Sequence, residues 1–81
     1  MVITVLFFAS LADAVGTREL SLAHMPGDTV ASVRDRLIAA HPQVSEFTET
    51  LLYAVDEEYA DEDAPVPAGA TLALIPPVSG G

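Results

Sequence analysis

The chain has 81 residues, a length that predicts one small domain. Hydrophobic residues make up 51% of it, which is too apolar a composition for a disordered chain. No apolar run approaches the roughly 20 residues that a membrane span needs, which argues against a membrane protein. Twelve acidic residues against three arginines and no lysine give a net charge of −9, which argues against nucleic acid as a partner and suits either a basic protein partner or simple solubility.

The first quarter of the sequence predicts two strands. Residues 2–8 form a run of β-branched and aromatic side chains that is typical of a buried strand. This segment has no basic leading region, so we do not interpret it as a secretory signal and we expect a cytoplasmic protein. Residues 10–15 predict a short helical turn that ends at Gly16. The alternation of apolar and polar side chains over residues 18–24 predicts a second strand, antiparallel to the first.

One amphipathic helix is predicted after the turn at residues 25–28. Thr29 is suited to cap the N-terminus of this helix, and Pro42 ends it near His41. Its expected apolar stripe comprises Val30, Val33, Leu37 and Ala40.

The second half of the sequence predicts shorter strands. Residues 44–50 form an acidic connection or turn, and residues 51–55 form an apolar strand. Residues 59–60 are expected as a brief edge strand, and residues 71–75 as the final strand.

This order of elements, ββαββ, predicts an α+β fold in which a mixed sheet wraps one main helix, the ubiquitin-like β-grasp arrangement. We expect the first and last strands to lie side by side in the centre, with residues 1–75 as the domain and residues 76–81 as a flexible Gly-Gly tail. The expected core comprises Ile3, Val5, Phe7, Leu20, Leu22, Val30, Val33, Leu37, Leu52, Leu72 and Leu74.

The last seven residues, IPPVSGG, point most directly to a function. Pro76 and Pro77 lack N–H donors and fix φ, which favours an extended arm. Gly80 and Gly81 carry no Cβ, so they could enter a slot too narrow for side chains, where a partner would act on the terminal carboxylate. The alternative is an ordinary frayed chain end.

Other candidate sites are weak. His24 and His41 are far apart and lack carboxylates at ligand spacing, so no metal site is predicted. The acidic residues between 56 and 63 lack the spacing of a calcium loop and are expected as a solvated face or a docking surface for basic groups. Arg34 and Arg36 are expected as surface charges on different faces of the helix. Without cysteine, any sulfur chemistry must use sulfur brought from elsewhere.

Several segments together resemble one family. VLFFAS at residues 5–10, VGT at residues 15–17, the helix start with Thr29-Val30, Val33-Arg34 and Leu37, and the final IPPVSGG resemble the small, sulfur-carrier subunit of molybdopterin synthase, in the ubiquitin-like sulfur-carrier family. Pro-Pro-Val and a small polar residue before Gly-Gly distinguish this branch from the thiazole-forming carrier. Two positions depart from the pattern: Ile75 stands where many members carry an aromatic residue, and Asp56 where asparagine is common.

The resemblance implies a sulfur carrier that is not an enzyme by itself and binds no cofactor. A ubiquitin-activating-like adenylyltransferase would use ATP to adenylate the carboxylate of Gly81, and a sulfur donor would convert it to a thiocarboxylate. The large subunit of molybdopterin synthase would then accept this end and transfer its sulfur to cyclic pyranopterin monophosphate, forming the dithiolene. Two small and two large subunits would form the assembly.

The resemblance also implies the site residues. Gly81 would be the acceptor of AMP and sulfur. The partner-binding residues would be Gly80, Ser79, Val78, Pro77, Pro76, Ile75, Leu74 and Phe7, with a core position as the favoured alternative for Phe7. Three other functions stay open: a ubiquitin-like modifier joined to lysines of target proteins, a sulfur carrier for thiamine or tRNA thiolation, and a binding module with a merely loose tail.

Overall fold

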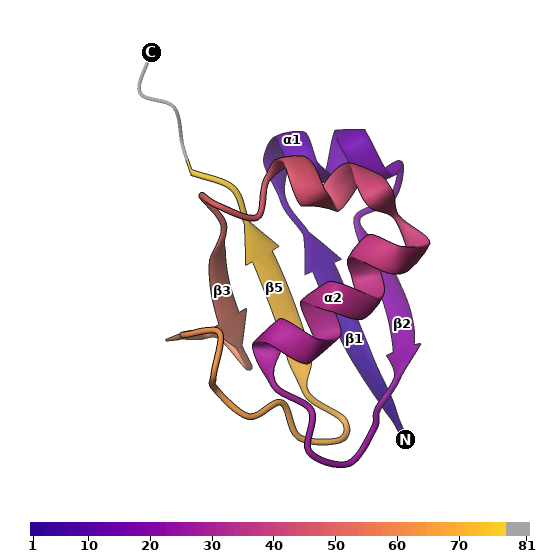
Figure 1. Cartoon of the computed structure of the whole chain (residues 1–81), viewed down its shortest axis with the longest axis vertical. Coiled ribbons are helices and arrows are strands. Elements are labelled where there is room, and N and C mark those ends of the chain that lie inside the picture. Colours follow the sequence, from indigo (N-terminus) through magenta and orange to yellow (C-terminus); the bar gives the residue numbers. More distant parts are fainter. Residues whose placement is uncertain (78–81) are drawn as a thin grey trace.

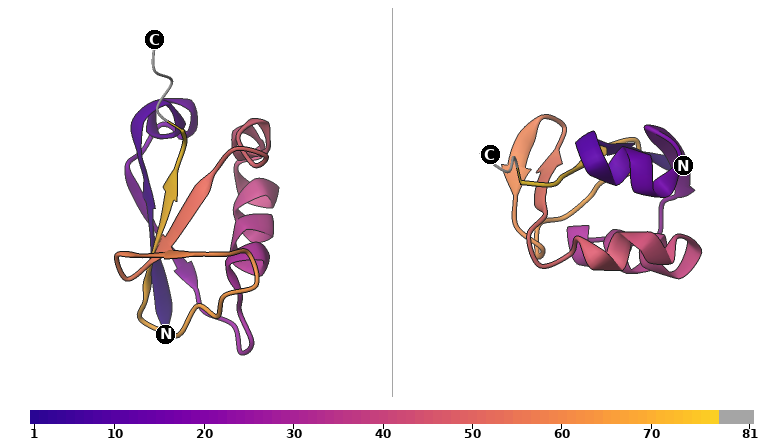
Figure 2. Two further views of the ribbon diagram at one scale, coloured as in Figure 1. Left: turned by 90° about the vertical axis from the view of Figure 1, so that its left-hand side faces the viewer. Right: turned by 90° about the horizontal axis from the view of Figure 1, so that it is seen from above.

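A computed structural model describes residues 1–77 as a five-stranded mixed sheet with one long helix across one face (Figure 1). The side view in Figure 2 shows that this helix lies on one side of the sheet only, which leaves the other face without a helix. The elements are β1 (Val2–Phe7), α1 (Ala9–Val15), β2 (Glu19–Ala23), α2 (Val30–Ala40), the 3-10 helix η1 (Pro42–Glu46), β3 (Leu52–Val55), β4 (Glu58–Ala60) and β5 (Thr71–Ile75).

The strand order is β2-β1-β5-β3-β4. The central strands β1 and β5 pair in parallel, and the other three pairs are antiparallel. The expected antiparallel second strand, the central place of the first and last strands and the brief edge strand are therefore confirmed. Because β1 and β5 run in the same direction, the chain enters and leaves the sheet at opposite ends of the molecule (Figure 1).

The main helix begins where the sequence predicts. The hydroxyl of Thr29 accepts a hydrogen bond from the backbone N–H of Ser32, and the Ser32 hydroxyl accepts one from the N–H of Thr29, which forms a capping box. The helix ends at Ala40, before Pro42. Ala40 was expected on the apolar stripe but is exposed, because the helix ends there and the chain turns into η1.

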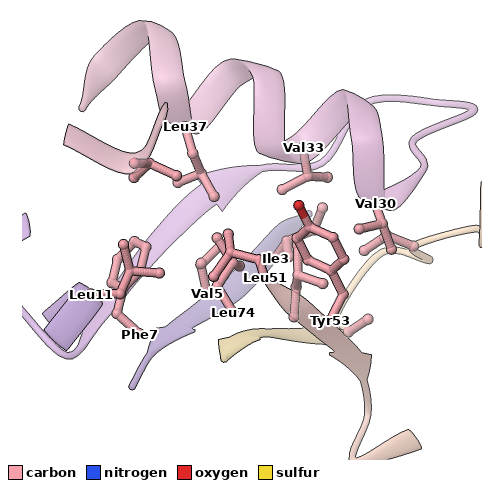
Figure 3. Close-up of a cluster of buried hydrophobic side chains, with 14 residues drawn as sticks. Ile3, Val5, Phe7, Leu11, Val30, Val33, Leu37, Leu51, Tyr53 and Leu74 are labelled. Atoms are coloured by element: carbon pink, nitrogen blue, oxygen red, sulfur yellow. The ribbon is translucent and has the colours of Figure 1, made fainter. Parts of the chain in front are cut away.

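The core fills the space between the sheet and α2 (Figure 3). Eight of the expected residues are buried, namely Ile3, Val5, Phe7, Val30, Val33, Leu37, Leu72 and Leu74. Leu20 and Leu22 pack against this cluster but are only partly buried, because they lie on an edge strand. Leu11 of α1 completes the core below the first helix, where only a short turn was expected.

The prediction for Leu52 was wrong. Its side chain is 50% exposed, whereas its neighbours Leu51 and Tyr53 are buried. Successive side chains of a strand point to opposite faces, so the burial of Tyr53 directs Leu52 outward. A run of apolar residues does not reveal which alternate set faces the core.

A second correction concerns the turn before α2. Asp28 is 6% exposed and forms an ion pair with Arg36, in which each of two guanidinium nitrogens lies 2.7 Å from a carboxylate oxygen. The backbone N–H of Met25 and the hydroxyl of Ser32 also donate to this carboxylate. Arg36 was expected as a surface charge, but it neutralises a buried anion and joins the turn to the helix.

Residues 1–77 contain no helix with both the length and the apolar character required to cross a membrane. Over the same residues, no group of three or more histidine and acidic side chains converges as a metal site.

Candidate functional site

The candidate site begins where β5 ends. Ile75 is the last residue of this central strand, Pro76 is buried and Pro77 is exposed. The adjacent strands support the exit, since Leu52 lies opposite Ile75 and the N–H of Phe8 donates to the carbonyl of Leu74 at 3.3 Å. The body therefore holds the base of the C-terminal segment through a central strand and a buried proline.

Four of the predicted site residues, Val78, Ser79, Gly80 and Gly81, lie outside the described residues, so their roles stay predictions. The same holds for the expected flexibility of residues 76–81.

Two other predicted partner residues point inward. Phe7 is 3% exposed and Leu74 is fully buried, and both side chains belong to the core (Figure 3). In this structure neither side chain offers surface to a partner, and the core alternative for Phe7 is confirmed. Ile75, one residue further along β5, is half-buried and lies on the face without a helix.

The outer face of the sheet, opposite α2, carries apolar residues of which sequence reasoning had assigned only Ile75 to the site. These are the alternate positions of the same strands: Leu6, Phe8, Leu52, Ala54, Tyr59, Ala73 and Ile75. Phe8 is 44% and Tyr59 77% exposed. The alternation within residues 2–8 and 71–75 could have identified the members on these strands, because the expected core already assigned the other half of each strand inward.

A shallow trough of about 280 Å³ runs over this face. The pairing register places Tyr59 beside Ala54, Ala54 beside Ala73, and Ala73 beside Leu6. Two alanines thus form the floor between larger side chains. The lining residues are Leu6, Phe8, Ala54, Tyr59, Ala73 and Ile75, with Glu57 and Thr71 at the start of β5.

The charge near the trough is mostly negative. Glu57 lines one end of the trough, and Glu19 lies across from Leu6 on the neighbouring strand. Arg18 lines an adjoining hollow together with Asp13, and this hollow shares Leu6 and Phe8 with the trough. The trough therefore joins an apolar floor to exposed carboxylates.

The other two arginines are held away from the trough. Arg34 donates to the hydroxyl of Tyr53 at 3.5 Å and forms an ion pair with Glu62, and these contacts raise the pKa of its guanidinium, the bond to Tyr53 most strongly. Arg36 is paired with Asp28, and this pairing holds the pKa of the Asp28 carboxyl well below its usual range. Their contacts run to different sides of α2, as the sequence predicted.

The histidines show no catalytic arrangement. A ring nitrogen of His24 lies 3.0 Å from the carbonyl oxygen of Val66, which ties β2 to the loop before β5. His41 caps the C-terminus of α2, where its backbone N–H donates to the carbonyl of Leu37. Both contacts stabilise the body.

A model of the ThiS family matches residues 5–81, which include the second half of β1, all the other helices and strands and the C-terminal motif. The chain belongs to the ThiS family.

The relatives of this ThiS-family chain include small subunits of molybdopterin synthase, the proteins that its sequence motifs resemble. It is 35% identical over 79 residues to the molybdopterin synthase sulfur carrier subunit of Arabidopsis thaliana, covering 98% of this chain and 82% of that protein. It is 33% identical to the sulfur carrier subunit of Chlamydomonas reinhardtii, with both chains covered completely. The resemblance to small subunits of molybdopterin synthase is thereby confirmed.

Solved structures confirm the β-grasp fold of this ThiS-family chain. SAMP1 from Haloferax volcanii superposes with a TM-score of 0.89 at 30% identity, and each chain is fully covered. A chain in the complex of subunits 1 and 2 of the molybdopterin-converting factor from Helicobacter pylori superposes with a TM-score of 0.73 at 21% identity, again over both full chains.

Proposed function

We propose that this chain is the sulfur-carrier subunit of a molybdopterin synthase and that the carboxylate of Gly81 is its reactive group. The observation that carries the proposal is the similarity to sulfur carrier subunits over 98% of the chain. In addition, the family match extends through the Gly-Gly end. A role in molybdenum cofactor biosynthesis is what these relatives have in common.

The proposed chemistry starts from an inert carboxylate. An oxygen of Gly81 attacks the α-phosphorus of ATP on an adenylyltransferase, pyrophosphate leaves, and an acyl adenylate forms. The terminal sulfur of a donor persulfide then displaces AMP to give an acyl disulfide, and a second thiol reduces the S–S bond, which leaves a thiocarboxylate on Gly81 and a disulfide between the two thiols. The sulfur passes to cyclic pyranopterin monophosphate in the large subunit, where two such transfers build the dithiolene. The small subunit binds no cofactor in this scheme and supplies no catalytic side chain.

The composition of the chain supports a role as acyl carrier. It contains no cysteine that could compete for the sulfur and no lysine whose amine could attack the activated end. Gly80 and Gly81 lack a Cβ, so the terminal segment can pass through a narrow channel to another protein's active site. The large subunit would supply the catalytic groups.

The outer face of the sheet supports a protein partner. Phe8, Leu52 and Tyr59 are exposed apolar residues on one face, and Ile75 connects this face to the C-terminal segment. A large subunit that covers this face would also receive the C-terminus. We propose an assembly of two small and two large subunits in the cytoplasm; the Helicobacter pylori complex is a precedent for pairing between the two kinds of subunit.

Intact-mass measurement tests the proposal. The protein is incubated with the adenylyltransferase of its own organism, ATP and a sulfur donor. We expect replacement of one oxygen by sulfur on Gly81, located by fragmentation of the terminal peptide. A variant with one alanine added after Gly81 serves as control: it should fold normally and accept no sulfur. A sulfur-free wild-type protein, or sulfur on the extended variant, would contradict the proposal.

A ubiquitin-like modifier is the second candidate, which the 30% identity to Haloferax volcanii SAMP1 brings forward. The same activated end would form an amide with a lysine of a target protein. Since this chain has no lysine, each target lysine would receive a single copy. Covalent conjugates of this chain in a cell extract would favour the modifier function. If the chain instead carried sulfur for thiamine synthesis or tRNA thiolation, labelled sulfur from Gly81 would appear in thiamine or in tRNA.

A further inference from the structure

The trough on the outer face has the shape of a site for one long side chain. Its floor is formed by Ala54 and Ala73, which carry only methyl groups, and its walls by Tyr59 on one side and Leu6 with Phe8 on the other. It follows β5 from Thr71 to Ile75, a distance of about 13 Å at the usual rise of a strand. An aliphatic stem could lie along this floor.

One end of the trough is charged. Glu57 is exposed and lines the trough beside Thr71, at the end farther from the C-terminal segment. The turn that carries Glu57 is fixed to β5, because the carboxylate of Asp56 accepts a hydrogen bond from the N–H of Thr71 at 2.9 Å. The carboxylate of Glu57 thus belongs to a well-anchored turn.

Charge and aromatic walls together indicate a cationic occupant. The chain carries a net charge of −9, and two of its three arginines are occupied by Glu62 and Asp28. The exposed ring of Tyr59, two residues after Glu57, can attract a guanidinium group over its face, whereas Phe8 lies at the other end of the trough and can contact only the aliphatic part of a side chain. An arginine side chain matches the apolar floor, the tyrosine wall and the anionic end.

The backbone at Glu57 carries a further observation. Asp56 and Glu57 form the two-residue turn between β3 and β4, with φ values of 49° and 71°. Such turns favour glycine at the second position, because a Cβ is disfavoured at positive φ. The chain places a glutamate there, so its carboxylate is held at the trough against the local preference of the backbone.

We infer that the trough holds an arginine side chain of the large subunit, with its guanidinium against Glu57 and its stem on Ala54 and Ala73. The inference rests on the proposed function for the identity of the partner. It assigns to Glu57 a role in recognition, separate from the sulfur chemistry of the C-terminal segment.

Binding to the large subunit from the same organism tests the inference. The dissociation constant is measured for the wild type, Glu57→Gln and Glu58→Gln at low ionic strength. Glu58 is the matched control, because it carries the same charge one residue further and pairs with Val55. We expect about tenfold weaker binding for Glu57→Gln and less than a twofold change for Glu58→Gln.

Glu57→Gly separates recognition from stability. Glycine relieves the positive φ, so this variant should unfold at a higher temperature than the wild type and yet bind as weakly as Glu57→Gln. A purely structural role for Glu57 would make stability and binding change in the same direction.

Two outcomes overturn the inference while leaving the proposed function intact. In the first, Glu57→Gln and Glu58→Gln bind as the wild type does. In the second, Glu57→Gln binds normally but Ala73→Met, which fills the floor, does not, so the occupant is apolar. A wild-type chain that fails to bind the large subunit at all would contradict both the inference and the proposed assembly.

Discussion

At the scale of single residues, the ion pair of Asp28 with Arg36 shows how a charge can be buried in so small a domain. The carboxylate receives donors from the guanidinium, the Met25 backbone and the Ser32 hydroxyl. A buried charge is tolerated when it is paired and its remaining lone pairs are hydrogen-bonded. Removing the charge would leave Arg36 without its partner and the turn without its anchor.

Asp28→Asn should therefore lower the free energy of unfolding at pH 7 by about 3 kcal/mol. Urea denaturation followed by circular dichroism measures this difference. Asp35→Asn is the control, since Asp35 pairs with Arg34 at the surface and its loss should cost less than about 1 kcal/mol. An equal loss of unfolding free energy in the two variants would show that the buried pair stabilises the fold no more than the surface pair does.

The same variants give the pH dependence. The pairing lowers the pKa of Asp28 in the folded state below its value in the unfolded state. The stabilisation of the fold by this ion pair is therefore complete above the unfolded-state pKa and is lost as the pH falls below it. The difference between wild type and Asp28→Asn should be constant from pH 5 to pH 7 and shrink below about pH 4. A difference that grows on acidification would contradict this assignment.

At the scale of elements, β5 serves two purposes with alternate residues. Leu72 and Leu74 complete the core, whereas Ala73 and Ile75 lie on the outer face. The same division holds for β1, where Phe7 faces inward and its neighbours Leu6 and Phe8 line the trough. Packing and the proposed partner recognition would thus depend on different residues of the same strands.

Two substitutions on β5 should separate these purposes. Leu74→Ala should cost about 2 to 5 kcal/mol of stability, because it opens a cavity beside α2. Ile75→Ala should change stability by less than about 1.5 kcal/mol but weaken binding to the large subunit at least fivefold. Thermal unfolding and titration of the complex measure the two effects. Strong binding by Ile75→Ala would remove Ile75 from the interface.

At the scale of the whole molecule, the sheet separates a covered face from an open one (Figure 2). The parallel pair β1 and β5 directs the C-terminal segment away from the N-terminus, at the end flanked by Phe8 and Leu52. The net charge of −9 adds a long-range field around this body. A basic partner would be attracted by the field before the apolar face makes contact.

Association with the large subunit should therefore depend on salt. Raising the ionic strength from about 0.05 M to about 0.5 M should lower the association rate roughly tenfold and change the dissociation rate much less. Stopped-flow fluorescence measures both rates. The double variant Asp61→Asn with Asp63→Asn is the comparison. It keeps the trough but removes two negative charges, so its association rate should fall less steeply with ionic strength. If the association rates of the wild type and the double variant depended equally on ionic strength, these two charges would have no part in the salt effect.

The amino-acid sequence by itself determined the order of the elements, the capped helix, most of the core and the family. Local signals decide these features: the hydroxyl of Thr29, the positive φ at Gly16, the rigid rings of Pro42 and Pro76, and the periodicity of the apolar residues. They need no knowledge of distant contacts.

Only the tertiary structure decided which side of β3 faces the core, whereas the expected core residues of β1 and β5 are buried as predicted. Leu51 and Leu52 are identical residues, and Leu51 is buried whereas Leu52, which was expected in the core, is 50% exposed. Likewise, Asp28 and Arg36 are eight positions apart in sequence and become partners only when the turn folds against α2. The physical reason is the same in both cases: these contacts form between elements, and the sequence of one short segment does not specify which side chain another element will cover.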